Sequence, residues 1–173
     1  RKPEDVRFMA VTKTVDSIYI NHALSLGIDL IGENRVQEFL GKYENYSENS
    51  EIHFIGGLQN NKVKYIIDKV SMIHSVDSVR LLETINREAE KLQRQVKVLL
   101  EVHIAKEATK SGFTPEEFLS LNTKLSTLNY IDVCGVMGMA TNTEDQEEWR
   151  RCFREIKSLA SRLSPIASSP EIS

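Results

Sequence analysis

One stretch near the start of the chain, Val6-Arg7-Phe8-Met9-Ala10-Val11-Thr12-Lys13-Thr14, runs like a buried strand and then reaches a lysine. A short apolar run before a helical pattern is typical of a strand in a parallel sheet, and such sheets carry their functional groups at the carboxyl ends of the strands. Lys13 stands at such an end. A partly desolvated amine there would lose its proton readily and could act as a Schiff-base nucleophile. The alternative, which this stretch alone leaves open, is a solvated lysine that closes a strand.

The rest of the chain alternates between helical and strand patterns. Further strands are predicted at 29–31, 52–55, 72–76, 96–102 and 131–137. Helices are predicted at 15–26, from 36, at 62–70, 78–92, 114–128 and 145–163. The last helix is expected to turn one set of side chains inward: Trp149, Phe153, Ile156, Leu159, Ala160 and Leu163.

Strict alternation of strands and helices predicts a parallel sheet covered by helices, either a (β/α) barrel or an open doubly wound sheet. Neither a Gly-x-Gly-x-x-Gly motif after a strand nor a Gly-Lys-Ser/Thr phosphate loop is present, which disfavours dinucleotide and nucleoside-triphosphate folds. An eight-stranded barrel needs about 200 residues or more. The pattern therefore predicts an α/β protein of the TIM-barrel type, a (β/α)8 barrel without its last two strands, over residues 1–163, with 164–173 as a loop or tail.

Composition narrows the class of protein. The chain has 173 residues, 40% of them hydrophobic, and a formal net charge of -3, with basic residues scattered, so a nucleic-acid partner is not expected. Cys134 and Cys152 lack the spacing of a disulfide framework or a metal site. We therefore expect a cytoplasmic protein without a metal site. No apolar run approaches the roughly 20 residues of a membrane span, so we expect no membrane partner.

The predicted strand ends bring together groups suited to a planar ring. They offer one amine at Lys13, hydrogen-bonding groups, small residues at Gly56 and soft methionine side chains. Each has an ordinary structural alternative. Asn34 could cap the next helix, His53 could be a core histidine, and Met137 and Met139 could be core residues.

Five motifs, in order along nearly the whole chain, resemble those of the pyridoxal phosphate homeostasis proteins. They are Ala10-Val-Thr-Lys-Thr14, Gly32-Glu-Asn-Arg-Val-Gln-Glu38, His53-Phe-Ile-Gly-Gly-Leu-Gln-Asn-Asn-Lys-Val-Lys64, Thr109-Lys-Ser-Gly-Phe113 and Gly135-Val-Met-Gly-Met-Ala140. The His53–Lys64 block is the most specific of them.

The resemblance implies the barrel of the alanine racemase amino-terminal domain, with pyridoxal 5'-phosphate held as a Schiff base on the lysine after the first strand. Here that lysine is Lys13. The resemblance also implies that Asn34 lies near the ring, that Met137 forms part of the wall under it, and that His53 and Lys110 lie nearby. The full set of expected cofactor-binding residues is Lys13, Asn34, His53, Gly56, Lys110, Met137 and Met139.

Members of this family are thought to bind and buffer the reactive aldehyde within vitamin B6 homeostasis, with no accepted catalytic reaction. The resemblance thus implies a binding protein, with apo-enzymes that need the cofactor as candidate recipients. The alternative is an enzyme, a racemase-like Schiff-base catalyst that uses Lys13. A racemase needs a second acid or base on the other ring face, commonly from another domain or subunit, and the sequence suggests no such domain.

The chain departs from the family pattern at its end. A Ser-Met-Gly-Met-Ser loop and a strand ending in Arg-Ile-Gly, which hold the phosphate and the pyridine nitrogen in the family, are expected where this sequence stops at Pro170-Glu171-Ile172-Ser173. A phosphate usually sits in a cup of backbone amides, so we expect cofactor retention to be weakened without that segment.

Overall fold

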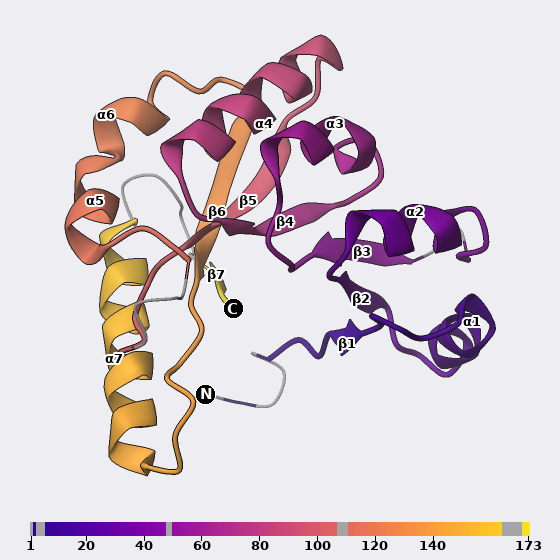
Figure 1. Ribbon diagram of the computed structural model, residues 1–173, viewed down its shortest axis with the longest axis horizontal. Coiled ribbons are helices and arrows are strands. Elements are labelled where there is room, and N and C mark those ends of the chain that lie inside the picture. Colours follow the sequence, from indigo (N-terminus) through magenta and orange to yellow (C-terminus); the bar gives the residue numbers. More distant parts are fainter. Residues whose placement is uncertain (1, 3–5, 48–49, 107–110, 164–170) are drawn as a thin grey trace.

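A curved parallel sheet forms the centre of the computed structural model, which describes residues 2, 6–47, 50–106, 111–163 and 171–173 (Figure 1). Within these residues, seven strands lie in the order of the sequence, and every neighbouring pair is parallel. They are β1 (Ala10–Val11), β2 (Leu30–Glu33), β3 (Glu51–Phe54), β4 (Met72–Val76), β5 (Val96–Glu101), β6 (Ile131–Met137) and β7 (Glu171–Ile172).

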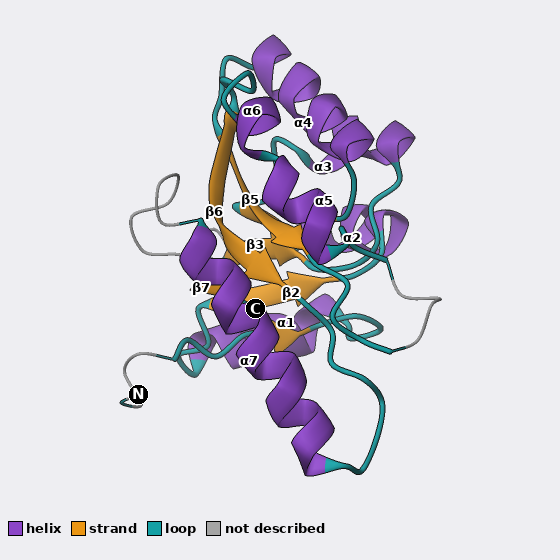
Figure 2. Ribbon diagram, turned by 90° about the vertical axis from the view of Figure 1, so that its left-hand side faces the viewer, coloured by secondary structure: helices purple, strands orange, loops and turns teal. Residues whose placement is uncertain are grey.

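Helices connect the strands and lie along the outer side of the curve (Figures 1 and 2). They are α1 (Ser17–Ser25), α2 (Val36–Tyr43), the 3-10 helix η2 (Asn60–Lys62), α3 (Val63–Ile66), α4 (Val79–Lys91), α5 (Pro115–Ser120), α6 (Asn122–Leu125) and α7 (Gln146–Arg162). In the described part of the chain no helix is both long and apolar enough to cross a membrane. The strands and helices together form an open half-barrel of the TIM type, so the predicted α/β fold class is confirmed.

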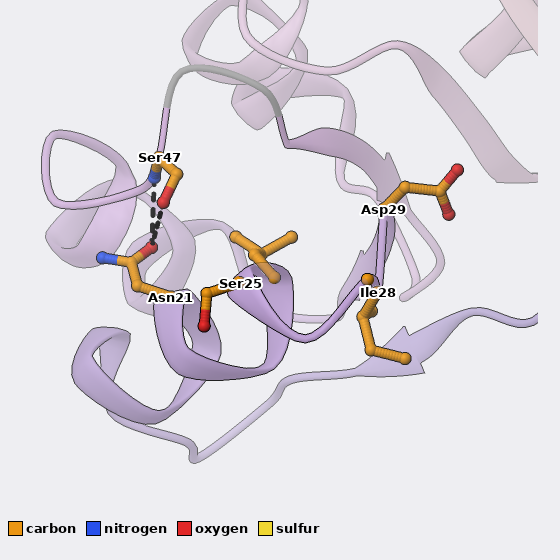
Figure 3. A pocket seen from close by; sticks show the side chains of 7 residues that line it. Asn21, Ser25, Ile28, Asp29 and Ser47 are labelled. Atoms are coloured by element: carbon orange, nitrogen blue, oxygen red, sulfur yellow. Dashed lines mark hydrogen bonds between the residues drawn. The ribbon is translucent and has the colours of Figure 1, made fainter.

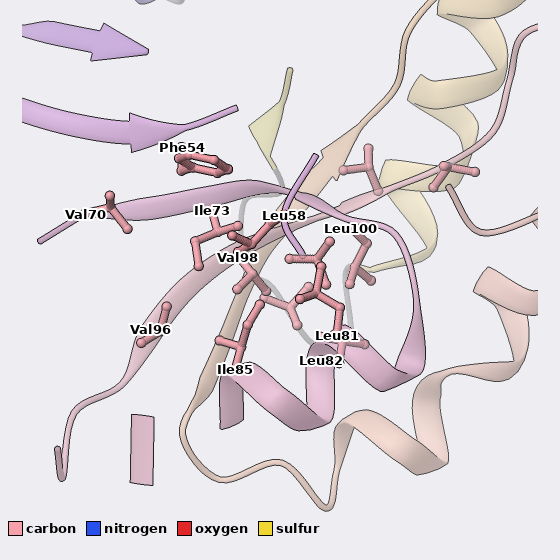
Figure 4. Packing of buried hydrophobic residues seen from close by; sticks show 14 of the residues in the cluster. Phe54, Leu58, Val70, Ile73, Leu81, Leu82, Ile85, Val96, Val98 and Leu100 are labelled. Carbon is pink, nitrogen blue, oxygen red and sulfur yellow. The ribbon is translucent and has the colours of Figure 1, made fainter. Parts of the chain in front are cut away.

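The main hydrophobic core lies between the sheet and the outer helices (Figure 4). Successive side chains of a strand point to opposite faces, so alternate residues such as Val98 and Leu100 enter this layer. They meet the apolar stripe of α4, in which Leu81, Leu82 and Ile85 are at most 1% exposed. Burial of this stripe, together with the Ser78 side chain that caps the helix, explains why the predicted helix forms here.

The inner face of the sheet carries a second, smaller cluster. Met72, Leu99 and Met137 are buried together, with Cys134 packed against them. These residues alternate with members of the outer core along their strands, which places them on the side of the sheet away from the helices. The inner face therefore combines a small apolar floor with the polar side chains described below.

Local differences from the sequence predictions have simple causes. Strands β4 and β6 have the predicted bounds, but the predicted strand over 6–14 pairs only at Ala10–Val11, because β1 has a neighbour on one side only. Residues 164–170 lie outside the described residues. Beyond them Glu171 and Ile172 form β7, where the sequence predicts a loop or tail, since two residues are too few for a periodic pattern.

The inward face of α7 differs from the prediction in its amino-terminal half. Trp149 is 41% exposed and Phe153 is 60% exposed, whereas Glu148 and Cys152 are buried instead. The cause is polar: the Glu148 carboxylate forms ion pairs with Lys106 and Arg151 and so turns inward. The predicted inward position of the other members is confirmed, namely Ile156, Leu159, Ala160 and Leu163.

Candidate functional site

Lys13 lies on the turn that follows β1, at the carboxyl end of the sheet. Its neighbour Thr12 is buried on the helix side, where its hydroxyl donates to the Glu33 carboxylate at 2.6 Å. Lys13 itself belongs to the turn, one residue beyond this buried threonine. The side chain is exposed, not partly desolvated as expected, because it stands on an edge turn at the open side of the half-barrel.

Asn34 and Gly56 approach each other closely at the ends of β2 and β3. A Cβ atom on Gly56 would lie 2.0 Å from the Asn34 carbonyl oxygen and 2.1 Å from its Oδ1 atom. The Gly56 carbonyl oxygen also accepts a hydrogen bond from the Ser75 hydroxyl. Asn34 does not cap α2, whose N-cap residue is Arg35 and has no side-chain cap bond. The absence of a side chain at Gly56 is thus what allows these two strand ends to meet.

His53 is buried in β3 and belongs to a hydrogen-bonded row of polar side chains. Its Nδ1 atom lies 2.8 Å from His74 Nε2, and its Nε2 atom lies 3.0 Å from the Glu51 carboxylate. His74 Nδ1 lies 3.0 Å from the Ser173 hydroxyl, and Arg7 donates to Glu51 at 2.6 Å. His53 is level with Val11 in the register, so this row lies below Lys13, deeper in the half-barrel.

The hydrogen bonds of this row can all be satisfied if protons are donated in one direction, from Ser173 towards Glu51. A carboxylate can only accept, so His53 donates its Nε2 proton to Glu51 and must accept at Nδ1. His74 then donates from Nε2 to His53 and accepts at Nδ1 from Ser173. Burial lowers the pKa of His74 to about 4 and also lowers the pKa of His53, where the Glu51 hydrogen bond opposes it. Both imidazoles are therefore neutral near pH 7.

The remaining predicted residues occupy different positions. Met137 is 8% exposed at the end of β6 and belongs to the inner apolar cluster, while Met139 is 46% exposed on the following loop. Lys110 lies outside the described residues. The structure thus brings Lys13, Asn34, Gly56 and Met137 to the same edge of the sheet and leaves His53 below them.

Two groups at this edge were not singled out from the sequence as site residues. Glu101, 2% exposed at the end of β5, accepts a hydrogen bond from Ser111 at 2.9 Å, and burial raises the pKa of its carboxyl group. Glu33 and Lys42 form a buried ion pair of 3.0 Å directly behind the Lys13 turn. Glu101 is recognisable in the sequence as a charge that ends an apolar strand, but the pairing of Glu33 with Lys42 has no sequence signal.

A surface pocket of about 340 Å³ lies at the opposite end of the sheet, between the end of α1 and the start of β2 (Figure 3). On its wall Asn21 accepts hydrogen bonds from the backbone and hydroxyl of Ser47, both at 3.1 Å. Function in parallel α/β folds is found at the carboxyl ends of the strands, and this pocket is at the amino end of β2. The described residues contain no group of three or more His, Cys, Asp or Glu that could hold a metal ion.

Comparison with known proteins places the chain among relatives of the same architecture. The family model for the alanine racemase N-terminal domain matches residues 1–172. The pyridoxal phosphate homeostasis protein of Aquifex aeolicus is 39% identical over 91% of this chain and 69% of its own length. The protein of the same name from Synechocystis is 33% identical over 96% of this chain and 77% of its own length.

Solved structures agree with this grouping. PipY from Synechococcus elongatus, solved with pyridoxal phosphate bound, superposes with a TM-score of 0.90 at 29% identity, over 99% of this chain and 82% of PipY. Its structure without the cofactor gives a TM-score of 0.93. An alanine racemase from Clostridium difficile shares the fold, with a TM-score of 0.81 at 18% identity over 99% of this chain and 49% of the enzyme.

Proposed function

This chain belongs to the pyridoxal phosphate homeostasis protein family, and from that membership we propose that it binds pyridoxal 5'-phosphate at the carboxyl end of its half-barrel. The observation that carries the proposal is the position of Lys13, an exposed primary amine on the turn after β1. PipY, which is similar to this chain over nearly its whole length, is a protein that binds this cofactor.

The described residues at the carboxyl ends of the strands fit the cofactor in their chemistry. Gly32 is paired with Val11, and the space that a side chain would take there is filled by Met9, whose sulfur would lie 2.7 Å from a Cβ atom. At Gly56 the same space is filled by Asn34, which brings the Asn34 amide to the carboxyl end of β3. Met137 supplies a polarizable surface of the kind that packs on an aromatic ring. The amine of Lys13, the amide of Asn34 and the thioether of Met137, all at the carboxyl ends of strands, support a site for an aromatic aldehyde there.

Pyridoxal phosphate supplies an aldehyde that condenses with a primary amine. We infer that Lys13 provides that amine and that Asn34 orients it or the ring with its side-chain amide. The other residues proposed to contact or surround the cofactor are His53, Gly56, Lys110, Met137 and Met139.

We infer that the protein holds and releases the cofactor and does not turn over a substrate. The relatives from Aquifex and Synechocystis are named for homeostasis and not for a reaction. Apo-enzymes that need the cofactor are the proposed recipients. Cys134 and Cys152 are both free, which supports the cytoplasmic location that we propose.

A titration with pyridoxal phosphate tests the proposal. Wild-type protein should develop a visible absorbance band as the cofactor binds, and Lys13→Ala should lose the band while keeping its circular dichroism spectrum and melting temperature. Amino-acid racemisation by the wild-type protein at ordinary enzyme rates, lost in Lys13→Ala, would instead establish an enzyme. A folded wild-type protein with no band would overturn the binding proposal.

A further inference from the structure

The backbone on both sides of Lys13 is held from behind by helix α2. The Lys42 ammonium donates to the Thr12 carbonyl oxygen at 3.0 Å and to the Val15 carbonyl oxygen at 3.4 Å. The Glu38 carboxylate accepts a hydrogen bond from the Thr14 amide. Three peptide groups within four residues are thereby fixed by two side chains of one helix.

Thr14 has a backbone conformation that needs such support. Its φ angle is 62°, in the left-handed region that residues with a side chain rarely adopt. The hydrogen bond from its amide to Glu38 holds this conformation, and that amide is the main cause that keeps the pKa of Glu38 below its ordinary value, with Lys42 adding to it. A strained residue directly after a functional lysine is the kind of feature that fixes a side-chain direction.

A buried carboxylate anchors the arrangement to the sheet. The Oε1 atom of Glu33 accepts from the Lys42 ammonium at 3.0 Å, the Thr12 hydroxyl at 2.6 Å and the Tyr46 hydroxyl at 2.6 Å. The Glu33 side chain is 0% exposed and that of Lys42 is 13% exposed, so this ion pair is shielded from solvent. Burial, together with donation to Glu33, raises the pKa of Tyr46 above its ordinary range, so its hydroxyl keeps its proton.

We propose that Lys42, Glu38 and Glu33 are positioning residues for Lys13. Resting on the proposed function, the inference is that they set the direction in which the Lys13 side chain leaves its turn and thereby the rate at which its amine captures an aldehyde. Lys13 itself is exposed and lies outside their network, so they act through the peptide groups beside it. A held amine reacts faster than one on a mobile turn because less orientation must be found on each encounter.

The alternative is that the network only stabilises the fold. The burial of the Glu33–Lys42 ion pair is compatible with this role, because breaking a buried ion pair destabilises most proteins. The two readings differ in one measurement. Positioning predicts slower capture at Lys13 in protein that is still folded, and a purely structural role predicts normal capture in every folded molecule.

The rate of capture can be measured with pyridoxal phosphate and borohydride, followed by mass spectrometry of the Lys13 peptide. We expect Lys42→Met, which keeps the side-chain stem and removes the ammonium, to slow capture at Lys13 by about tenfold. Lys91→Met is the matched control: it removes an ammonium from the exposed 2.8 Å ion pair with Glu88 on α4, and should leave the rate unchanged.

Glu38→Ala provides a second variant if Lys42→Met fails to fold, because the Glu38 side chain is 25% exposed at the edge of the network. It should also slow capture and should speed hydrogen exchange at the Thr14 amide. Wild-type rates in folded Glu38→Ala or folded Lys42→Met, or an equal loss in Lys91→Met, would overturn the positioning role. Absence of capture at Lys13 in the wild-type protein would overturn the proposed function itself, so the two failures are distinguishable.

Discussion

Gly56 shows how one atom can decide whether two strand ends meet. A Cβ atom at this position would lie 2.0 Å from the Asn34 carbonyl oxygen, too close for either backbone to stay in place. The next residue, Gly57, has nothing within 4 Å of its hypothetical Cβ atom. These adjacent glycines therefore form a natural pair of test and control.

Gly56→Ala should destabilise the protein by about 1–3 kcal/mol, because the extra methyl group forces a backbone shift. It should also weaken binding of pyridoxal phosphate, since Asn34 moves with it. Gly57→Ala should change neither quantity by more than the scatter typical of surface substitutions. Urea unfolding and cofactor titration of both variants provide the measurements, and equal behaviour of the pair would contradict the account of this contact.

For single residues, the sequence predicts the position in the fold better than the contacts of the side chain. Lys13 and Asn34 could be placed at the carboxyl edge from the strand patterns alone. The role of Lys42 could not, because Glu38 and Lys42 are spaced as an ordinary ion pair on a helix surface. Only the fold shows that Lys42 also reaches Glu33 and the Thr12 carbonyl oxygen, thirty residues away in sequence.

The row of His53 and His74 links separate strands and makes stability depend on pH. His74, whose burial lowers its pKa from 6.5 to about 4, binds its proton more weakly in the folded than in the unfolded chain. Between these two values the unfolded state binds more protons, so the free energy of unfolding falls as the pH falls. For His74 the decrease is roughly 3 kcal/mol over the whole window.

We expect His74→Gln to flatten this decrease between pH 6.5 and 4.5, as measured by urea unfolding at several pH values, because glutamine does not titrate and keeps an N–H for His53. The charged groups that act on His53 are Glu51, Arg7 and Glu171. The pKa of Glu51 is lowered by the Arg7 hydrogen bond, so it titrates below this window. The raised pKa of Glu101 makes the free energy of unfolding rise as the pH falls. This opposite contribution is the same in the wild-type protein and in His74→Gln.

His22→Gln, on the exposed surface of α1, is the matched control and should keep the wild-type slope. If the free energy of unfolding of His74→Gln falls between pH 6.5 and 4.5 as steeply as that of the wild-type protein, the histidine pair does not cause the pH dependence.

Helix α7 shows why element faces are harder to predict than elements. Its length follows from the apolar period, and Trp149 and Phe153 extend that period with Ile156. The ion pairs of Glu148 with Lys106 and Arg151 compete with burial of the aromatic rings and rotate the amino-terminal half. The hydrophobic pattern of a helix cannot predict that a carboxylate will be buried because it forms an ion pair with a residue on a distant loop.

For the whole molecule, alternation of strands and helices was sufficient to predict a parallel sheet covered by helices, while the absence of nucleotide-binding motifs and the family resemblance favoured the barrel over an open sheet. Register, curvature and the pairing of β7 with β6 were not predictable, because they arise from contacts between distant residues. The motifs added what alternation lacked, since they tied Lys13, the His53 block and Met137 to one family in one order. The amine of Lys13, the paired ends of β2 and β3, and Met137 at the end of β6 all lie at the carboxyl ends of the strands of the resulting half-barrel.

Identification of the residue that carries the cofactor tests this account most directly. Wild-type protein incubated with pyridoxal phosphate, reduced with borohydride and digested should yield one modified peptide, with the pyridoxyl group on Lys13. Folded Lys13→Ala should yield none. A pyridoxyl group found instead on another lysine, such as Lys110, or the same labelling in folded Lys13→Ala, would contradict the central claim that Lys13 holds the cofactor.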